Sequence, residues 1–310
     1  MAASRADWTA YARWGGLLLG AAAAVYAGLI WLAGALYFSA YSGAQESALR
    51  RRRLGIAALR ESAWLGREAG ALLWRERKGF LRDVKHWSQM LLVAGLVFVY
   101  LFSIRRLPLD SAELRSLISF LNIGTAGFVI AALGLRFTYP SVSLEGRAWW
   151  IVRAAPVSLG TVMTQKLLLS LLPMTALALV LSGASCWLLR SDAFTTLLSV
   201  GSLVVVTWGL CVMGVGLGAV FPLFAVENIH QIESSLGGFV YMASALCYIA
   251  ATVMILSWPM RVHFERSFGH FVAWQRGSLA FCGLLWLALN AAAFFVPWRM
   301  GLRALERHEG

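Results

Sequence analysis

The connector between residues 136 and 166 holds the side chains with the clearest chemical character in this 310-residue chain. Its centre carries the carboxylate Glu145, followed directly by a glycine, an arginine and two adjacent tryptophans, and prolines lie at 140 and 156. Proline interrupts helices and fixes one backbone angle, so a short aromatic element between two prolines is expected to be rigid. The pattern indicates a contact surface. Adjacent tryptophans are also typical of interfacial anchors, but that alternative leaves Glu145 and its neighbours unexplained.

Catalytic and metal-binding motifs are not found in the sequence. There is no H-E-x-x-H, no G-x-S-x-G and no pair of carboxylates inside an apolar stretch. His263 and His270 flank Glu265, but a solvated loop explains these three residues better than a metal site. The phosphate-binding motif G-x-x-x-x-G-K-[ST] is also absent. We therefore expect no enzymatic activity, no metal and no cofactor in this chain, and if ATP is used, another chain must bind it.

The elements that position the connector are apolar enough to cross a membrane. The chain is 59% hydrophobic and 14% charged, whereas soluble domains are near half apolar and a quarter charged. An all-α polytopic membrane protein with about seven transmembrane helices is expected. The expected spans are 15–40, 90–104, 117–138, 167–189, 194–220, 236–258 and 279–296. A signal peptide is the alternative for the first span, which is too long for one.

The net charge of +12 is concentrated at the ends of the apolar stretches. This distribution argues against nucleic-acid binding and for orientation of helices in a bilayer. One set of alternate connectors carries about twice as many Lys and Arg residues as the other. The bias predicts a multi-pass protein of the bacterial cytoplasmic (inner) membrane, with its N-terminus outside and its C-terminus in the cytoplasm.

Residues 73–89 alternate between apolar and basic at helical spacing, as expected for an amphipathic helix lying in the membrane interface. A solvated basic connector is the alternative, because Arg77 interrupts the apolar face. The residues assigned to this interfacial elbow helix are Trp74, Arg75, Lys78, Phe80, Arg82, Lys85 and Trp87.

Four motifs in this order resemble a known family. They are L-W-R-E-R-K-G-F-L-R-D before W-S-Q at 87–89, S-I-R-R-L-P at 103–108, S-x-E-G-R-x-W-W-x-x-R-x-x-P-V-S at 143–158, and G-L-G-A-V-F-P-L-F-A-V-E-N with I-x-S-S-L-G-G at 216–238. Together they cover about residues 70–300 and are similar to the coupling-helix loop and core of type-2 ABC-transporter permeases, most closely the ABC exporter permeases.

The resemblance implies a leading transmembrane helix at 1–45, a basic linker with the elbow helix at 46–89, a six-helix permease core at 90–298 and a cytoplasmic tail at 299–310. It further implies a permease subunit of an exporter, with ATP and Mg²⁺ bound by a separate ABC ATPase subunit that docks on the connector. The implied coupling residues are Glu145, Gly146, Arg147, Trp149, Trp150, Arg153 and Pro156.

Further partners follow from the same resemblance. A second permease chain or a homodimer is expected, and the first helix is hypothesised to complete a partner's core in a split tandem permease. The alternative function is a non-transporting membrane scaffold or assembly subunit, or a membrane-embedded enzyme of another class.

Overall fold

The computed structural model describes residues 13–17, 19–28, 30, 31, 34, 84–105, 112–149, 154, 157–226, 229–267 and 275–307. The chain divides into two compact units, Met1–Trp64 and Leu65–Gly310. In the first unit the described residues are helical and exposed, including Trp14 and Trp31. From residue 15 onward they fall within the expected first span, while residues 46–83 of the expected linker and elbow helix lie outside the described residues.

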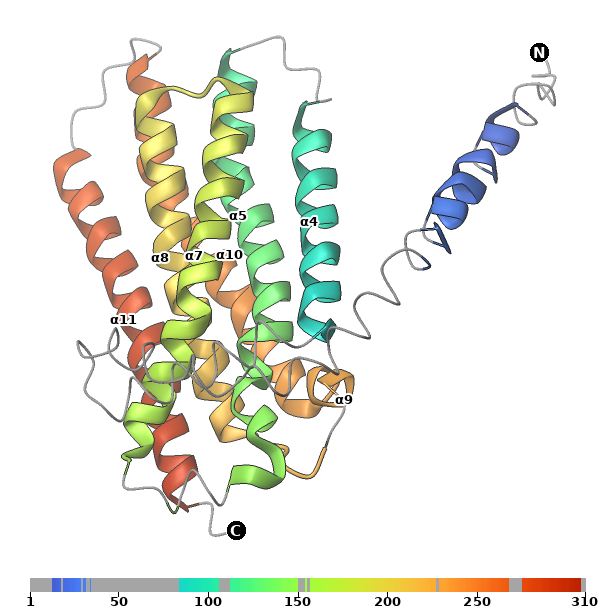
Figure 1. Cartoon of the computed structure of the whole chain (residues 1–310). Helices are drawn as coiled ribbons and strands as arrows, with labels where there is room; N and C mark the ends of the chain where they lie inside the picture. The colour runs from blue at the N-terminus through green and yellow to red at the C-terminus, as the bar shows by residue number, and fades with distance from the viewer. Residues whose placement is uncertain are drawn as a thin grey trace, which may run out of the picture. The chain divides into compact units, whose positions relative to one another are not determined.

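The second unit is a bundle of long helices that run side by side (Figure 1). Every regular element in the described part of the chain is helical, which confirms the all-α expectation. The elements are α4 (Val84–Arg105), α5 (Ala112–Phe137), η3 (Tyr139–Ser141), η4 (Ser143–Ala148), α7 (Leu159–Leu189), α8 (Ala193–Val220), α9 (Ile229–Glu233), α10 (Leu236–Ser267) and α11 (Gln275–Arg307).

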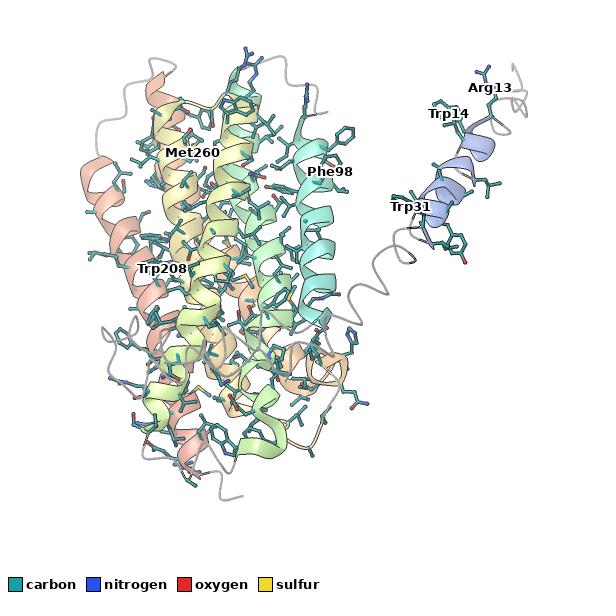
Figure 2. The ribbon with its side chains drawn as sticks, in the orientation of Figure 1. Arg13, Trp14, Trp31, Phe98, Trp208 and Met260 are labelled. Carbon is teal, nitrogen blue, oxygen red and sulfur yellow. The ribbon has the colours of Figure 1, made fainter. Side chains whose placement is uncertain are left out.

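Five helices in the described residues are long and apolar enough to cross a membrane. They are Leu117–Gly146, Leu159–Leu189, Ala193–Val220, Leu236–Glu265 and Gly277–Arg307, and Val93–Arg105 is a shorter apolar helix. The chain is therefore a membrane protein, and the count of seven spans stays a prediction. Large apolar side chains on the outer faces of the helices are suited to contact with lipid. Phe98 of α4, for example, points away from the neighbouring helices (Figure 2).

Short polar side chains begin two of the long helices. Ser158 accepts a hydrogen bond from the Thr161 backbone N–H at 3.2 Å and caps α7. Asp192 caps α8 through the Thr195 N–H at 3.4 Å. Helix α7 therefore begins eight residues before the expected apolar span, which places Lys166 inside the helix.

Helix α8 is the centre of the bundle and packs against α5, α7, α10 and α11. Glycines allow this close packing. A Cβ atom on Gly216 would lie 2.5 Å from the Pro297 carbonyl oxygen of α11, and one on Gly214 would lie 2.8 Å from Thr138. Small residues at these positions therefore allow the close helix contacts.

Polar side chains link the helices within their apolar surroundings. Tyr100 of α4 donates to Asn122 of α5, whose amide donates to Ser185 of α7 at 2.5 Å. Tyr248 of α10 donates to Asn290 of α11 at 2.6 Å. Both asparagines are therefore interhelical links, as expected for isolated amides inside membrane helices.

Replacing Gly216 with alanine should destabilise the bundle by roughly 1–3 kcal/mol, because the new methyl group overlaps backbone atoms of α11 that cannot move independently. Gly201→Ala on the same helix is the matched control, because nothing lies within 4 Å of its added Cβ. That control should leave stability unchanged or slightly raised. Thermal unfolding of both variants in detergent tests this, and equal melting temperatures would contradict it.

Candidate functional site

The connector between α5 and α7 is held against the connector between α8 and α9 at one end of the bundle. The Ser143 hydroxyl oxygen accepts a hydrogen bond from the Leu223 N–H at 3.1 Å. The Trp149 ring stacks on Phe224 with centroids 5.0 Å apart and an interplanar angle of 14°. We call residues 143–149 the clamped segment, since both of its ends are attached to the second connector.

Gly146 supplies the turn in the clamped segment. Its backbone angles are φ 52° and ψ −136°, a conformation that side-chain-bearing residues rarely adopt. A Cβ here would also approach the Phe224 carbonyl oxygen at 3.7 Å, an ordinary contact. The glycine is therefore needed for its backbone conformation and not for space.

Glu145 and Lys166 form a buried ion pair that ties the clamped segment to α7. The Lys166 Nζ donates to Glu145 Oε1 at 2.8 Å, and the two side chains are only 5% and 9% exposed. A charge removed from water at this depth is costly unless it is paired. The pair therefore explains why a lysine is tolerated inside an apolar helix and why a glutamate lies in the facing turn.

Tyr139 anchors the start of the same connector among α8 and α10. Its ring is fully buried and stacks on Tyr241 at 5.9 Å, and its hydroxyl lies 3.2 Å from the Ser235 hydroxyl. The backbone of Tyr139 lies so close to Gly218 that any side chain there would overlap it. The end of α5, the end of α8 and the start of α10 are thus packed together.

Of the seven predicted coupling residues, the structure brings three together. Glu145, Gly146 and Trp149 lie in the clamped segment, and the two side chains face the chain's own helices. Leu144 is the large apolar side chain that this segment exposes, at 44%. The backbone of Arg147 belongs to η4, but its side chain lies outside the described set. Trp150, Arg153 and Pro156 lie outside it entirely, so a partner contact of these residues stays a prediction.

The predicted elbow residues are described only in part. Lys85 and Trp87 lie in the first turns of α4, with side chains that are not described. Trp74, Arg75, Lys78, Phe80 and Arg82 fall outside the described residues. The interfacial elbow helix stays a prediction.

Sequence reasoning missed three members of this site. Lys166 was noted only as the last residue of the connector at 136–166, and Leu223 and Phe224 only within a motif. Their partners are 21, 80 and 75 residues away along the chain. The one available signal was a lysine next to an apolar stretch, which in a membrane helix implies a partner.

The opposite end of the bundle carries a second polar contact. His263 Nε2 of α10 lies 2.9 Å from Asp192 Oδ2, and the imidazole stacks on Phe194 with centroids 4.3 Å apart. Glu265 pairs with Arg261 at 3.0 Å, and His270 is outside the described residues. Among the described residues no three His, Cys, Asp or Glu side chains gather as a metal site would require.

The surroundings of Asp192 favour its charged form. Burial raises the pKa of this carboxyl, but hydrogen bonds from the Thr195 hydroxyl and N–H, together with the nearby His263, outweigh burial and hold the pKa below its ordinary value. The contact therefore joins the α7–α8 turn to the end of α10 through an ionised carboxylate at neutral pH.

Breaking the buried pair from one side should cost about 3 kcal/mol. Glu145→Gln leaves the Lys166 ammonium without its carboxylate in a buried position. The matched control is Glu265→Gln, which opens the more exposed Arg261–Glu265 pair and should cost less than about 1 kcal/mol. Thermal unfolding in detergent measures both, and an equal loss in the two variants would contradict the assignment.

Stability contributed by the Asp192 carboxylate should disappear in acid. Because the folded-state pKa is lowered, the contribution is present above the unfolded pKa, near 3.9, and is lost as the pH falls through the folded-state pKa. Asp192→Asn retains a good helix cap and removes only the charge. The melting temperatures of wild type and variant should differ at pH 6 and converge on acidification, and a gap that widens toward pH 3 would contradict this.

Comparison with known proteins identifies the family of the chain. The family model described as "Putative ATP-binding cassette" matches residues 1–309. No curated protein and no solved structure matches the chain significantly.

This match corrects the interpretation drawn from the four motifs. The chain was expected to be a type-2 ABC-transporter permease, acting as the permease subunit of an exporter. The family that matches is described by ATP binding and not as a permease, so both the recognition and the function derived from it are wrong. Two parts of the interpretation hold: the chain belongs to an ABC family, and it has helices long and apolar enough to cross a membrane. Over nearly its whole length, the chain belongs to the putative ATP-binding cassette family.

Proposed function

We propose that this chain is the membrane-embedded, non-catalytic component of an ATP-binding cassette assembly, and that it holds a nucleotide-binding partner chain at the clamped segment. The observation that carries the proposal is the fixation of residues 143–149 at one end of a bundle of membrane-length helices. Three different contacts hold this short segment: the Ser143 hydrogen bond, the Trp149 stack and the Glu145–Lys166 ion pair.

The rigidity of the clamped segment supports a docking role. A flexible loop must be ordered when a partner binds it, which costs free energy, whereas an element fixed to α7 and to the α8–α9 connector is already ordered. Leu144 provides the apolar contact that such a segment offers outward.

Binding of ATP and Mg²⁺ by the partner chain is supported by the sequence. A cassette that binds ATP through a P-loop needs a strand, the G-x-x-x-x-G-K-[ST] loop and a helix. That motif does not occur in the 310 residues. This chain therefore contributes the membrane part of the assembly and the partner contributes the phosphate-binding loop.

The charge bias supports an orientation for this arrangement. The connectors at the clamped end belong to the set richer in Lys and Arg, and this bias favours a cytoplasmic location for that end in a bacterial cell, with the N-terminus outside. Cytoplasmic ATP is then available to a partner docked there.

Photolabelling with 8-azido-ATP tests where the nucleotide binds. The tagged full chain is labelled once alone in detergent and once as the assembly that copurifies with it from its native membranes. We expect no label on this chain in either sample, and ATP-displaceable label on a copurifying chain. Displaceable labelling of this chain by itself would overturn the proposal.

Leu144→Glu should release the nucleotide-binding partner, since burying a carboxylate at the interface is unfavourable. We expect about a tenfold loss of ATP hydrolysis copurifying with the tagged chain, with an unchanged melting temperature of the chain itself. Arg190→Glu is the matched control, an exposed position at the opposite end of α7. Unchanged copurifying activity in Leu144→Glu, or an equal loss in both variants, would place the partner elsewhere.

A further inference from the structure

The last turns of α11 present three arginines on one face. Arg299, Arg303 and Arg307 are spaced by four residues, and all three are exposed. Residues four apart lie on the same side of a helix. None of the three pairs with a carboxylate among the residues that the structure describes. We call this set the arginine stripe.

The opposite face of the same turns fixes the direction of the stripe. Gly301 packs so closely on α8 that an added Cβ would lie 2.7 Å from the Gly216 carbonyl oxygen. Leu305 is buried in a cluster with Met163 and Val215, to which Leu302 also contributes. Because α11 cannot rotate without losing these contacts, the arginines are held outward and away from the bundle.

The arginine stripe follows directly on an exposed apolar face formed by the preceding turns of α11. Phe295 and Val296, one turn before Arg299, are 57% and 54% exposed, and Ala292 before them is also exposed. Arg303 lies about 6 Å beyond Arg299 along the axis, which is comparable to the headgroup layer of a bilayer, roughly 5–8 Å per side. The face therefore changes from apolar to cationic over the depth at which a lipid changes from acyl chain to phosphate.

We propose that the arginine stripe binds the phosphate headgroup of an anionic phospholipid whose acyl chains lie along Phe295 and Ala292. Guanidinium groups bind phosphate oxygens in pairs of parallel hydrogen bonds, which makes arginine better suited to this ligand than lysine. An acidic protein surface would match the charges but not the exposed apolar face that continues directly from them. Leu144, the proposed contact for the nucleotide-binding partner, is not part of this site, although Trp149 of the clamped segment packs in the same buried cluster as Leu305.

The position of the stripe agrees with this ligand. The end of α11 lies at the same end of the bundle as α9 (Figure 1). Positive charges near an anionic membrane surface each strengthen binding about fivefold. Two arginines at headgroup depth should therefore change affinity for an anionic lipid by about thirtyfold.

Native mass spectrometry of the full chain in neutral detergent tests the proposal. The chain is titrated with palmitoyl-oleoyl phosphatidylglycerol and, separately, with phosphatidylcholine of the same acyl chains. Wild type should bind the anionic lipid more tightly. Arg299→Gln/Arg303→Gln should weaken that binding about thirtyfold and leave phosphatidylcholine unaffected. Arg299→Lys/Arg303→Lys should keep part of the preference, since charge remains without paired hydrogen bonds.

Arg105→Gln/Arg190→Gln is the matched control, because it removes two exposed charges at the opposite end of the bundle. It should retain the wild-type preference, and all variants should keep the wild-type melting temperature because the replaced side chains are exposed. Equal binding of the two lipids by wild type, or an equal loss in the control, would overturn the proposal. So would complete displacement of the lipid by millimolar inorganic phosphate, which would identify a site for a soluble anion.

One further outcome separates the lipid from a protein ligand. If Arg299→Gln/Arg303→Gln keeps its lipid preference but loses copurifying ATP hydrolysis, the stripe is a protein-contact surface and the proposal is wrong. If the lipid preference is lost and the copurifying activity stays, the lipid site is supported whatever becomes of the docking proposal.

Discussion

Gly216 and Gly218 bring the backbone of α8 against α11 and against the turn after α5, and most of the described architecture depends on this close approach. The contact with Pro297 and Gly301 sets the rotation of α11 and with it the direction of the arginine stripe. The contact with Tyr139 places the connector that carries the clamped segment. Helices in lipid associate through such close packing, because the hydrophobic effect does not drive them together there.

A few polar contacts add specificity to this packing. Asn122 and Asn290 join neighbouring helices, while Glu145 and Lys166 join a connector to a helix. A buried ion pair contributes little net stability compared with apolar packing, but losing one partner is costly. The Glu145–Lys166 pair therefore favours one arrangement of the clamped segment over others that would separate the two charges.

The sequence predicted local features of the site better than its contacts. Ser158 is a typical helix-capping residue and caps α7, because capping depends on residues three positions apart. The apolar span was expected to begin only at residue 167, because Lys166, in the second turn of α7, is tolerated there only through its pairing with Glu145 on a different segment. The family inferred from four motifs within residues 70–300 was wrong, whereas the family match extends over residues 1–309.

By itself the sequence determined that the chain is helical and embedded in a membrane, because long apolar stretches must satisfy their backbone hydrogen bonds internally in lipid. It also determined where the backbone turns, since the backbone angles that Gly146 and the prolines allow depend on those residues themselves. Only the tertiary structure decided that Glu145 and Trp149 face inward, toward Lys166 and Phe224, and that three arginines of α11 face outward. Helical spacing shows which residues share a face, but the direction of that face depends on which neighbours pack most closely against the helix.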